Sequence, residues 1–224
     1  MKLLILILSF YSTVALAVAN HEIYDGNSNK KLPMEQMVDQ IQAGDIVVVG
    51  EVHDRKMDHD HQVQLIQALV DRGFVVNVGM EFFSYIHQAF VKNYLSGVLT
   101  EEEFLNSIGW GGDNFQLYKE QMWQAKDSGG TVIALNMPRT VTKEISKKGL
   151  GSISPESQKL MPPDFELGND LYKQRFLELL GGHGGHAFLE NMFAAQSTWD
   201  DTMAWKAIEK INQNPDQIMV IIVG

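Results

Sequence analysis

The stretch VVVGEVHDRKMDHDHQ, residues 47–62, places a run of apolar residues directly before a cluster of acidic residues and three histidines. The apolar run belongs to DIVVVGE, residues 45–51, and a continuous run of this kind is typical of a strand buried on both faces. From Asp58 onward, apolar residues recur at helical spacing until Gly73. The stretch therefore predicts a buried strand, a polar turn and an α-helix.

The same alternation continues to the end of the sequence. Further buried-type strands are predicted at FVVNVGME (74–81), TVIALN (131–136) and QIMVIIVG (217–224). Helices are predicted at 33–43, 84–95, 114–128 and 140–148. A further short helix is predicted to begin at the capping box formed by Thr100 and Glu103, and two more helices are predicted on either side of GGHGGH (181–186). Strands that alternate with helices predict an α/β fold with a mostly parallel β-sheet flanked by helices on both faces.

Composition excludes several classes of protein. The chain has 224 residues, of which 45% are hydrophobic, so it is long and apolar enough for one sizeable domain. Its formal net charge of -10 argues against a nucleic-acid partner, because such proteins usually carry a basic surface. The absence of cysteine excludes disulfides, thiolate metal sites, covalent haem attachment through C-x-x-C-H and a cysteine nucleophile.

The first residues, MKLLILILSFYSTVALAVANHE, have the pattern of a secretory signal peptide. Lys2 precedes an apolar run, and Ala17-Val18-Ala19 supplies the small residues at which cleavage is expected, after Ala19. A membrane anchor or a buried N-terminal helix is the alternative, but Tyr11, Ser12 and Thr13 interrupt the run. The sequence predicts a signal peptide at 1–19 and an exported chain at 20–224, which is periplasmic in a Gram-negative cell.

Polar side chains are expected to gather where the parallel strands end. Glu51 and His53 follow the first strand, Glu81 ends the second and Asn136 the third, and ligands collect at this edge of α/β sheets. If these strands are neighbours, the side chains converge at one edge. Glu51, His53 and Glu81 form a carboxylate–histidine set of the kind that Zn²⁺ or Mn²⁺ accepts. Alternatively, the carboxylates stabilise the starts of the following helices and His53 orients the loop.

The other histidines allow two interpretations each. Residues 58–61, DHDH, are either metal ligands or the polar entry to a helix, and His59 and His61, two residues apart, do not share a helix face. GGHGGH places His183 and His186 in a glycine-rich segment, which is either a flexible connector or a mobile loop that offers an imidazole to a ligand.

The helical regions are rich in methionine and phenylalanine, with 11 of each in the chain. Stripes of such residues usually form a core. They also suit a flat apolar ligand such as haem, whose iron additionally needs a tyrosine, histidine or methionine. Composition does not choose among the available tyrosines, which are Tyr85, Tyr94, Tyr118 and Tyr172.

The order of the motifs is more specific than any single motif. VVVGEVHDRKMDHDHQVQLI is followed by VGMEFF, then VIALNMPRTVTKEISKKGL, then LYKQRFLELLGGHGGHAFLENMFAAQSTWDDTMAWKAI. This order resembles the ChaN-like haem-binding uptake family, which belongs to a superfamily with the Tiki and TraB proteins. The resemblance covers residues 33–224.

The resemblance implies that residues 20–224 form one α/β domain with a smaller inserted helical subdomain. It also implies a role in iron acquisition, in which ferric haem is bound non-covalently near the interface of a homodimer. In the family a tyrosine of one subunit ligates the iron, and a histidine and a lysine of the other hold the propionates. Tyr118 and Tyr172 are the candidates for the iron, and His183 or His186 for a propionate. An outer-membrane haem receptor is the implied partner.

The sequence departs from the family pattern in two places. No cysteine follows the apolar run at the N-terminus, so lipid anchoring is not carried over, and the sequence stops at a strand end where relatives continue into a loop with a further histidine. The C-terminus is therefore expected to be truncated.

The Tiki and TraB relatives suggest an alternative function, a divalent-metal-dependent hydrolase. In that alternative, Glu51, His53 and Glu81 would hold an ion that lowers the pKa of a bound water toward ~7.

Overall fold

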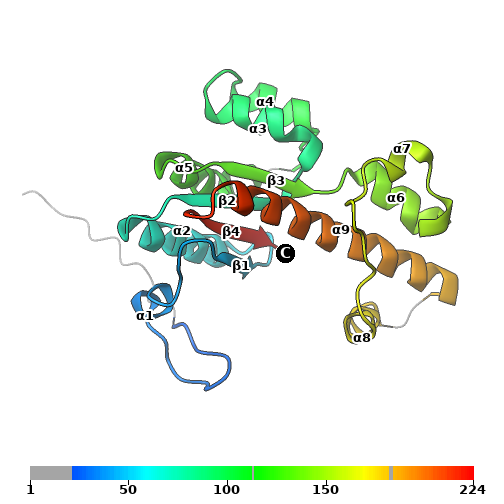
Figure 1. The fold of residues 1–224 in the computed structure, drawn as a ribbon, viewed down its shortest axis with the longest axis horizontal. Helices are drawn as coiled ribbons and strands as arrows, with labels where there is room; N and C mark the ends of the chain where they lie inside the picture. Colours follow the sequence, from blue (N-terminus) through cyan, green and yellow to red (C-terminus); the bar gives the residue numbers. More distant parts are fainter. Residues whose placement is uncertain (1–21, 113, 182–183) are drawn as a thin grey trace, which may run out of the picture.

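A four-stranded, all-parallel sheet forms the centre of the computed structural model, which describes residues 22–112, 114–181 and 184–224 (Figure 1). Its strands lie in the order β1-β4-β2-β3, and every neighbouring pair is parallel. The predicted α/β class is confirmed. The strands are β1 (Ile46–Gly50), β2 (Val76–Ser84), β3 (Val132–Asn136) and β4 (Ile218–Val223).

The helices follow the predicted alternation with the strands, and the capping box of Thr100 and Glu103 is confirmed. The helix predicted at 33–43 is wrong beyond its first turns, because the Asp45 carboxylate accepts the Gln42 N–H at 2.8 Å and so favours a turn there. The α-helices are α1 (Met34–Val38), α2 (Lys56–Asp71), α3 (Gln88–Leu95), α4 (Glu101–Ile108), α5 (Lys119–Asp127), α6 (Arg139–Lys148), α7 (Pro155–Gln158), α8 (Asp170–Leu179) and α9 (His186–Gln213). The 3₁₀ helices in the described residues are η1 (Tyr85–His87), η2 (Asn114–Leu117) and η3 (Leu150–Ser152).

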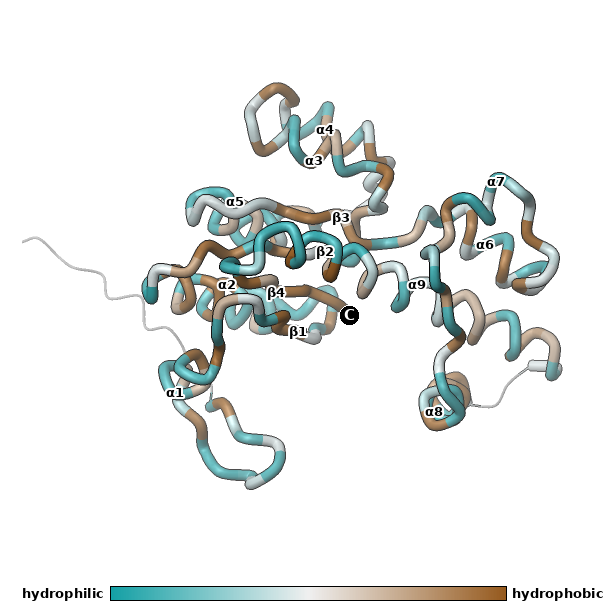
Figure 2. Tube along the Cα trace, in the orientation of Figure 1, coloured by the Kyte–Doolittle hydropathy of each residue, from teal (hydrophilic) through white to brown (hydrophobic). Residues whose placement is uncertain are grey.

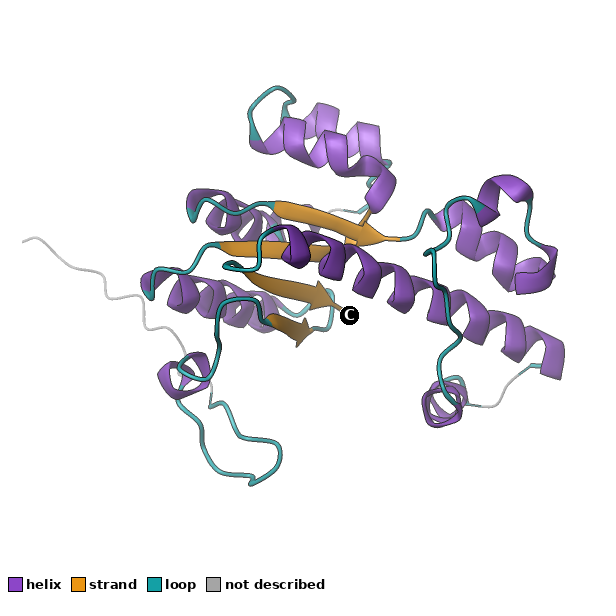
Figure 3. Cartoon of the chain, in the orientation of Figure 1, coloured by secondary structure: helices purple, strands orange, loops and turns teal. Residues whose placement is uncertain are grey.

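Helices cover the two faces of the sheet separately (Figure 3). One core cluster packs α2 and α5 against the sheet, for example through Leu69 and Met122. The other packs the C-terminal half of α9 against β3 and β4 through Met203, Ala207 and Ile211. Each fully buried side chain of this size contributes about 1.5–3 kcal/mol, so these two layers fix the position of the strands. In Figure 2 the strands are largely brown, as expected for buried strands.

The edge strand β1 departs from the sequence prediction. Its residues alternate between exposed and half-buried, and Val48 is 63% exposed, so the prediction that this strand is buried on both faces is wrong. The cluster under α9 draws on β3 and β4, and β1 lies beyond β4 at the edge of the sheet. The strands β2, β3 and β4 are buried along nearly their whole length, as predicted.

A helical subdomain lies beyond the carboxyl ends of the strands. The N-terminal half of α9 extends past the sheet, and α6, α7 and α8 lie around it (Figure 1). A separate apolar cluster joins α6 to α9 through Val141, Ile145, Ala194 and Ala195. One long helix therefore belongs to both the sheet and the subdomain. In residues 22–112, 114–181 and 184–224, no helix is both long and apolar enough to cross a membrane.

Candidate functional site

The strand ends bring Glu51, His53 and Glu81 to one edge of the sheet, although β1 and β2 are not neighbours. The strand β4 lies between them, and its following residue, Gly224, connects the two sides. The Gly224 N–H donates to Glu81 Oε2 at 2.7 Å. The His53 ring lies so close to Gly224 that a Cβ there would be 2.1 Å from its Cε1 atom. Gly224 and the half-exposed His53 ring therefore lie in contact between the two carboxylates.

The Glu51 carboxylate is the centre of a buried hydrogen-bond network. Its side chain has no exposed surface. Oε1 accepts the Tyr118 hydroxyl at 2.7 Å and lies 3.0 Å from His53 Nδ1, while Oε2 accepts the Gln62 amide at 2.6 Å and lies 3.5 Å from His59 Nδ1. Both oxygens are therefore occupied by side chains of the protein itself. A buried carboxylate with this many partners is satisfied without a ligand.

Tyr118 is part of that network and does not reach the surface. It is 0% exposed, and its ring packs on Phe82 with a centroid distance of 4.2 Å. Burial, then the hydrogen bond to Glu51, raises the pKa of Tyr118 well above its usual value. The phenol therefore stays protonated and acts as a hydrogen-bond donor.

Sequence reasoning missed His59 and Gln62 as members of the network. His59 is buried, and its Nε2 lies 3.1 Å from the His53 carbonyl, while Gln62 accepts from the Gln121 amide at 3.0 Å. One signal was available: Gln62 is a polar residue on the apolar face of the predicted helix, and a buried amide needs a partner. Asp58 accepts the Val52 N–H at 2.8 Å, which agrees with a polar helix entry.

Glu81 stands in a different environment, beside a pocket of about 790 Å³. Burial raises the pKa of its carboxyl, whereas the Gly224 N–H and the nearby His53 act in the opposite direction. Asn136, at the end of β3, donates to the Glu81 carbonyl at 2.8 Å and also accepts the Met137 N–H, so its amide has a structural role. The pocket has the size of a small-molecule site.

No group of three or more histidine, aspartate and glutamate side chains in the described residues is arranged to hold a metal ion. Glu51 directs both oxygens to Tyr118, Gln62 and the histidines, as described above. The geometry therefore gives no support to the Zn²⁺ or Mn²⁺ site expected at Glu51, His53 and Glu81.

The second candidate tyrosine, Tyr172, lies on α8 in the helical subdomain. Its hydroxyl donates to Asp200 Oδ2 on α9, and its ring contacts Phe193 at a centroid distance of 5.4 Å. Burial, then the hydrogen bond to Asp200, raises the pKa of Tyr172 above its usual value. Unlike Tyr118, the residue is only half-buried.

Apolar side chains are exposed around Tyr172. On α8, Leu171 and Leu179 are 57% and 87% exposed, and with Arg175 they follow a spacing of four residues along one face of the helix. Leu167, before α8, and Phe188, near the start of α9, are also about half exposed. We call Leu167, Leu171, Leu179 and Phe188 the apolar α8 surface. These side chains, from α8, the segment before it and the start of α9, are exposed enough to contact a ligand or a partner.

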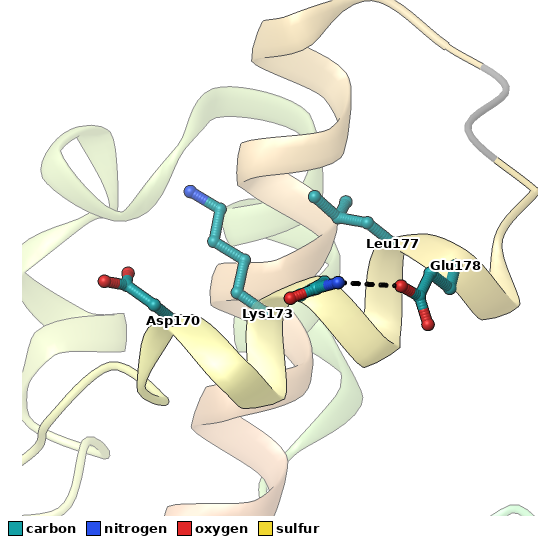
Figure 4. Close-up of a pocket in the computed structure, with 5 residues that line it drawn as sticks. Asp170, Lys173, Leu177 and Glu178 are labelled. Atoms are coloured by element: carbon teal, nitrogen blue, oxygen red, sulfur yellow. Dashed lines mark hydrogen bonds between the residues drawn. The ribbon is translucent and has the colours of Figure 1, made fainter.

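A shallower pocket of about 490 Å³ lies on α8 itself. Figure 4 shows its side chains along the helix, with a hydrogen bond of 3.0 Å between Gln174 and Glu178. Lys173 binds Glu190 of α9 at 2.7 Å and so ties the two helices together. The residues that line this pocket on α8 are Asp170, Lys173, Gln174, Leu177 and Glu178.

The structure places one of the two loop histidines. His186 is the first residue of α9, its side chain is 90% exposed, and its Nε2 lies 3.7 Å from Glu190. His183 lies outside the described residues. The predicted signal peptide at 1–19 lies outside them as well.

Comparisons with known proteins agree with this architecture. No curated protein matches the chain. Among solved structures, ChaN of Campylobacter jejuni, in a structure describing cofacial heme binding to that protein, matches with a TM-score of 0.66 and 15% identity over 89% of this chain and 78% of that chain. The type III effector HopBA1 matches with a TM-score of 0.46 and 16% identity over 85% of this chain and 71% of that chain.

At this level of identity the ChaN structure shows a shared fold. The family model described as haem-binding uptake, Tiki superfamily, ChaN, matches residues 37–224, which is most of the chain. The resemblance inferred from the order of motifs is thereby confirmed. The chain belongs to the ChaN family of haem-binding uptake proteins in the Tiki superfamily.

Proposed function

We propose that the protein is exported to the periplasm and binds ferric haem non-covalently and reversibly as part of haem uptake. The observation that carries this proposal is the family match over residues 37–224. The sequence pattern at 1–19 supports export. With no cysteine in the chain, neither a thioether link nor a thiolate ligand is available, so an oxygen, imidazole or thioether must meet the iron.

The residues on α8 fit a haem better than those at the strand ends. A haem needs a wide apolar contact, an accessible ligand for the iron and cations near its carboxylates. The apolar α8 surface supplies the contact, and Tyr172 supplies a half-buried oxygen that would have to leave Asp200 and the neighbouring Gln196 to become available. Tyr118 would have to leave a fully buried network. We therefore assign the iron to Tyr172.

Two copies of the chain would bind haem better than one in this arrangement. Leu171, Leu179 and Phe188 are exposed, so a haem resting on α8 would keep one face in water. Covering that face with a second subunit removes apolar surface from water at about 25 cal/mol per Å². We accordingly propose a homodimer whose interface includes α8, with His186 near the carboxylate edge of the haem.

Haemin titration of the full chain, followed by absorbance, tests this proposal. The variant Leu171→Glu/Leu179→Glu places two charges on the apolar α8 surface and should weaken haemin binding at least about tenfold, because each buried charge costs more than 1.4 kcal/mol. Val98→Glu is the matched control, since Val98 is 69% exposed but lies between α3 and α4. Equal haemin binding by all three proteins would overturn the proposed site. No haemin binding by the unaltered chain would overturn the function.

A divalent-metal-dependent hydrolase is the second candidate. The pocket of about 790 Å³ that His53 and Glu81 line would give its substrate a place to bind at the carboxyl edge of the sheet, although the described side chains are not arranged as a metal site. Calorimetric titration with Zn²⁺ and Mn²⁺ tests it. If the Glu81→Gln variant binds these ions at least tenfold more weakly, the hydrolase is favoured. If the variant binds them as tightly as the unaltered chain, the hydrolase proposal is rejected.

A further inference from the structure

A second pocket, of about 660 Å³, lies between α6 and α9 in the helical subdomain. It touches the pocket at the strand ends, because Arg139, Thr140 and Trp199 line both. The function proposed above uses neither of its two walls. The wall from α6 consists of Arg139, Thr140, Thr142, Lys143 and Ser146, and the wall from α9 consists of Met192, Ala195, Gln196 and Trp199.

The α6 wall carries positive charge that the protein leaves unpaired. Arg139 and Lys143, with Lys147 beyond them, are spaced by four residues and therefore share one face of the helix. None of the three has an ion-pair or hydrogen-bond partner for its side chain in the described parts of the chain. The neighbouring Lys148, by contrast, binds Glu144 at 2.9 Å. Both are exposed, so in a chain with a net charge of -10 they form a local positive region at this pocket that is open to an anionic ligand.

The α9 wall is apolar and aromatic. Met192, Ala195 and Trp199 provide a surface against which a flat apolar group can pack. The indole N–H of Trp199 is buried and has no hydrogen-bond partner among the described residues, so one donor beside the pocket is unused. A ligand that matches both walls carries an anion at one end and an apolar plate at the other.

Hydrogen bonds connect this pocket to the proposed iron ligand. Gln196, from the α9 wall, donates to Asp200 Oδ1 at 3.0 Å, and the other oxygen of Asp200 accepts the Tyr172 hydroxyl. Tyr172 and Gln196, a residue of the pocket wall, therefore share the Asp200 carboxylate.

We propose that the pocket between α6 and α9 binds a carboxylate carried by a flat apolar body, with Arg139 and Lys143 facing the carboxylate and Trp199 the apolar body. That chemistry has two sources. One is the propionate edge of haem, and this source rests on the function proposed above. The other is a separate small aromatic acid, which does not depend on haem.

Calorimetric titration of the haem-free full chain with 2-naphthoate tests the shared chemistry. The neutral 2-naphthylmethanol, which has a similar shape, should bind at least tenfold more weakly. Lys143→Gln should weaken 2-naphthoate binding at least tenfold and leave the alcohol unchanged. Lys147→Gln is the matched control, because it removes the same charge from the same helix face without lining this pocket, and it should leave both ligands unchanged.

Haemin and its dimethyl ester, in which both carboxylates are capped, distinguish the two sources. If haem is the source, Lys143→Gln weakens haemin binding at least tenfold but leaves binding of the ester unchanged, and haemin displaces 2-naphthoate. If the source is a separate acid, 2-naphthoate binds equally well to the haemin-saturated chain, and Lys143→Gln leaves haemin binding unchanged. The inference is overturned if 2-naphthoate does not bind the unaltered chain, or binds Lys143→Gln equally well. Failure of haemin to bind overturns only the proposed function, since the 2-naphthoate experiment contains no haem.

Discussion

Two regions of this protein contain the same pair of side chains, a tyrosine hydroxyl that donates to a carboxylate. Tyr118 donates to Glu51 where the first strand ends, and Tyr172 donates to Asp200 in the helical subdomain. The first pair is fully buried, whereas Tyr172 is half-buried among exposed leucines. The same contact is therefore buried in the fold in one place and half exposed in the other, where we propose that the tyrosine binds iron.

The partners of the two carboxylates explain the difference. Glu51 is surrounded by Tyr118, His53, Gln62 and His59, so releasing Tyr118 would disturb the whole network. Asp200 accepts only from Tyr172 and Gln196 among the described side chains. Tyr172 can accordingly leave at a smaller cost. We expect the first region to respond to substitution by losing stability and the second by losing ligand affinity.

The largest expected effect is on stability, from Glu51→Ala. This change leaves the Tyr118 hydroxyl and the Gln62 amide buried without their acceptor, and should lower the free energy of unfolding by about 3 kcal/mol. Urea unfolding followed by circular dichroism measures it. Glu209→Ala, which removes an exposed pair with Lys206, should cost about 0.5 kcal/mol or less. If Glu51→Ala is as stable as this control, the network does not hold the fold together.

The pH dependence of haemin affinity tests the proposed role of Tyr172 as the iron ligand. The pKa of Tyr172 is raised, so the phenol is protonated at neutral pH and must release one proton when its oxygen meets the iron. Haemin affinity should therefore rise by about tenfold per unit between pH 6 and pH 8. Titrations at three pH values measure the slope. A slope that persists in Tyr172→Phe would show that the proton comes from another group.

The smallest expected effect is again on stability, from Glu81→Gln. Because burial raises the pKa of Glu81 in the folded protein, its charged form destabilises the fold above that pKa, and this cost vanishes as the pH falls below the ordinary value of 4.5. The glutamine variant should therefore melt at a higher temperature at pH 7, and the two curves should meet near pH 4. Thermal melts across this range measure it, and a less stable variant at pH 7 would reject the assignment.

The sequence predicted the fold well because the buried strands carry their own pattern. FVVNVGME and QIMVIIVG are largely apolar, and the structure buries most of β2 and β4 on both faces. The pattern failed at β1, where VVVG is equally apolar but lies at the sheet edge. Hydrophobic periodicity reports whether a segment forms a strand, whereas burial also depends on which helix lies above it, and the position of α9 is a tertiary property.

The sites were less accessible to sequence reasoning. Residue type and strand-end position were enough to select Glu51, His53 and Glu81. The partners of Glu51 come from α2 and from a tyrosine 67 residues away, and no local pattern indicates such a contact. The sequence also could not separate Tyr118 from Tyr172, because their difference lies in burial. No sequence pattern indicated the pocket between α6 and α9, because Arg139 and Trp199 are far apart in the chain.

The most direct test of the account compares Tyr118→Phe with Tyr172→Phe in haemin titrations followed by absorbance, alongside urea unfolding of each variant. We expect Tyr172→Phe to change the haemin spectrum and weaken haemin binding, with little loss of stability. We expect Tyr118→Phe to keep the spectrum but lose about 1–2 kcal/mol of stability, because Glu51 loses a donor. A changed spectrum in Tyr118→Phe together with an unchanged one in Tyr172→Phe would contradict it and move the haem to the strand ends.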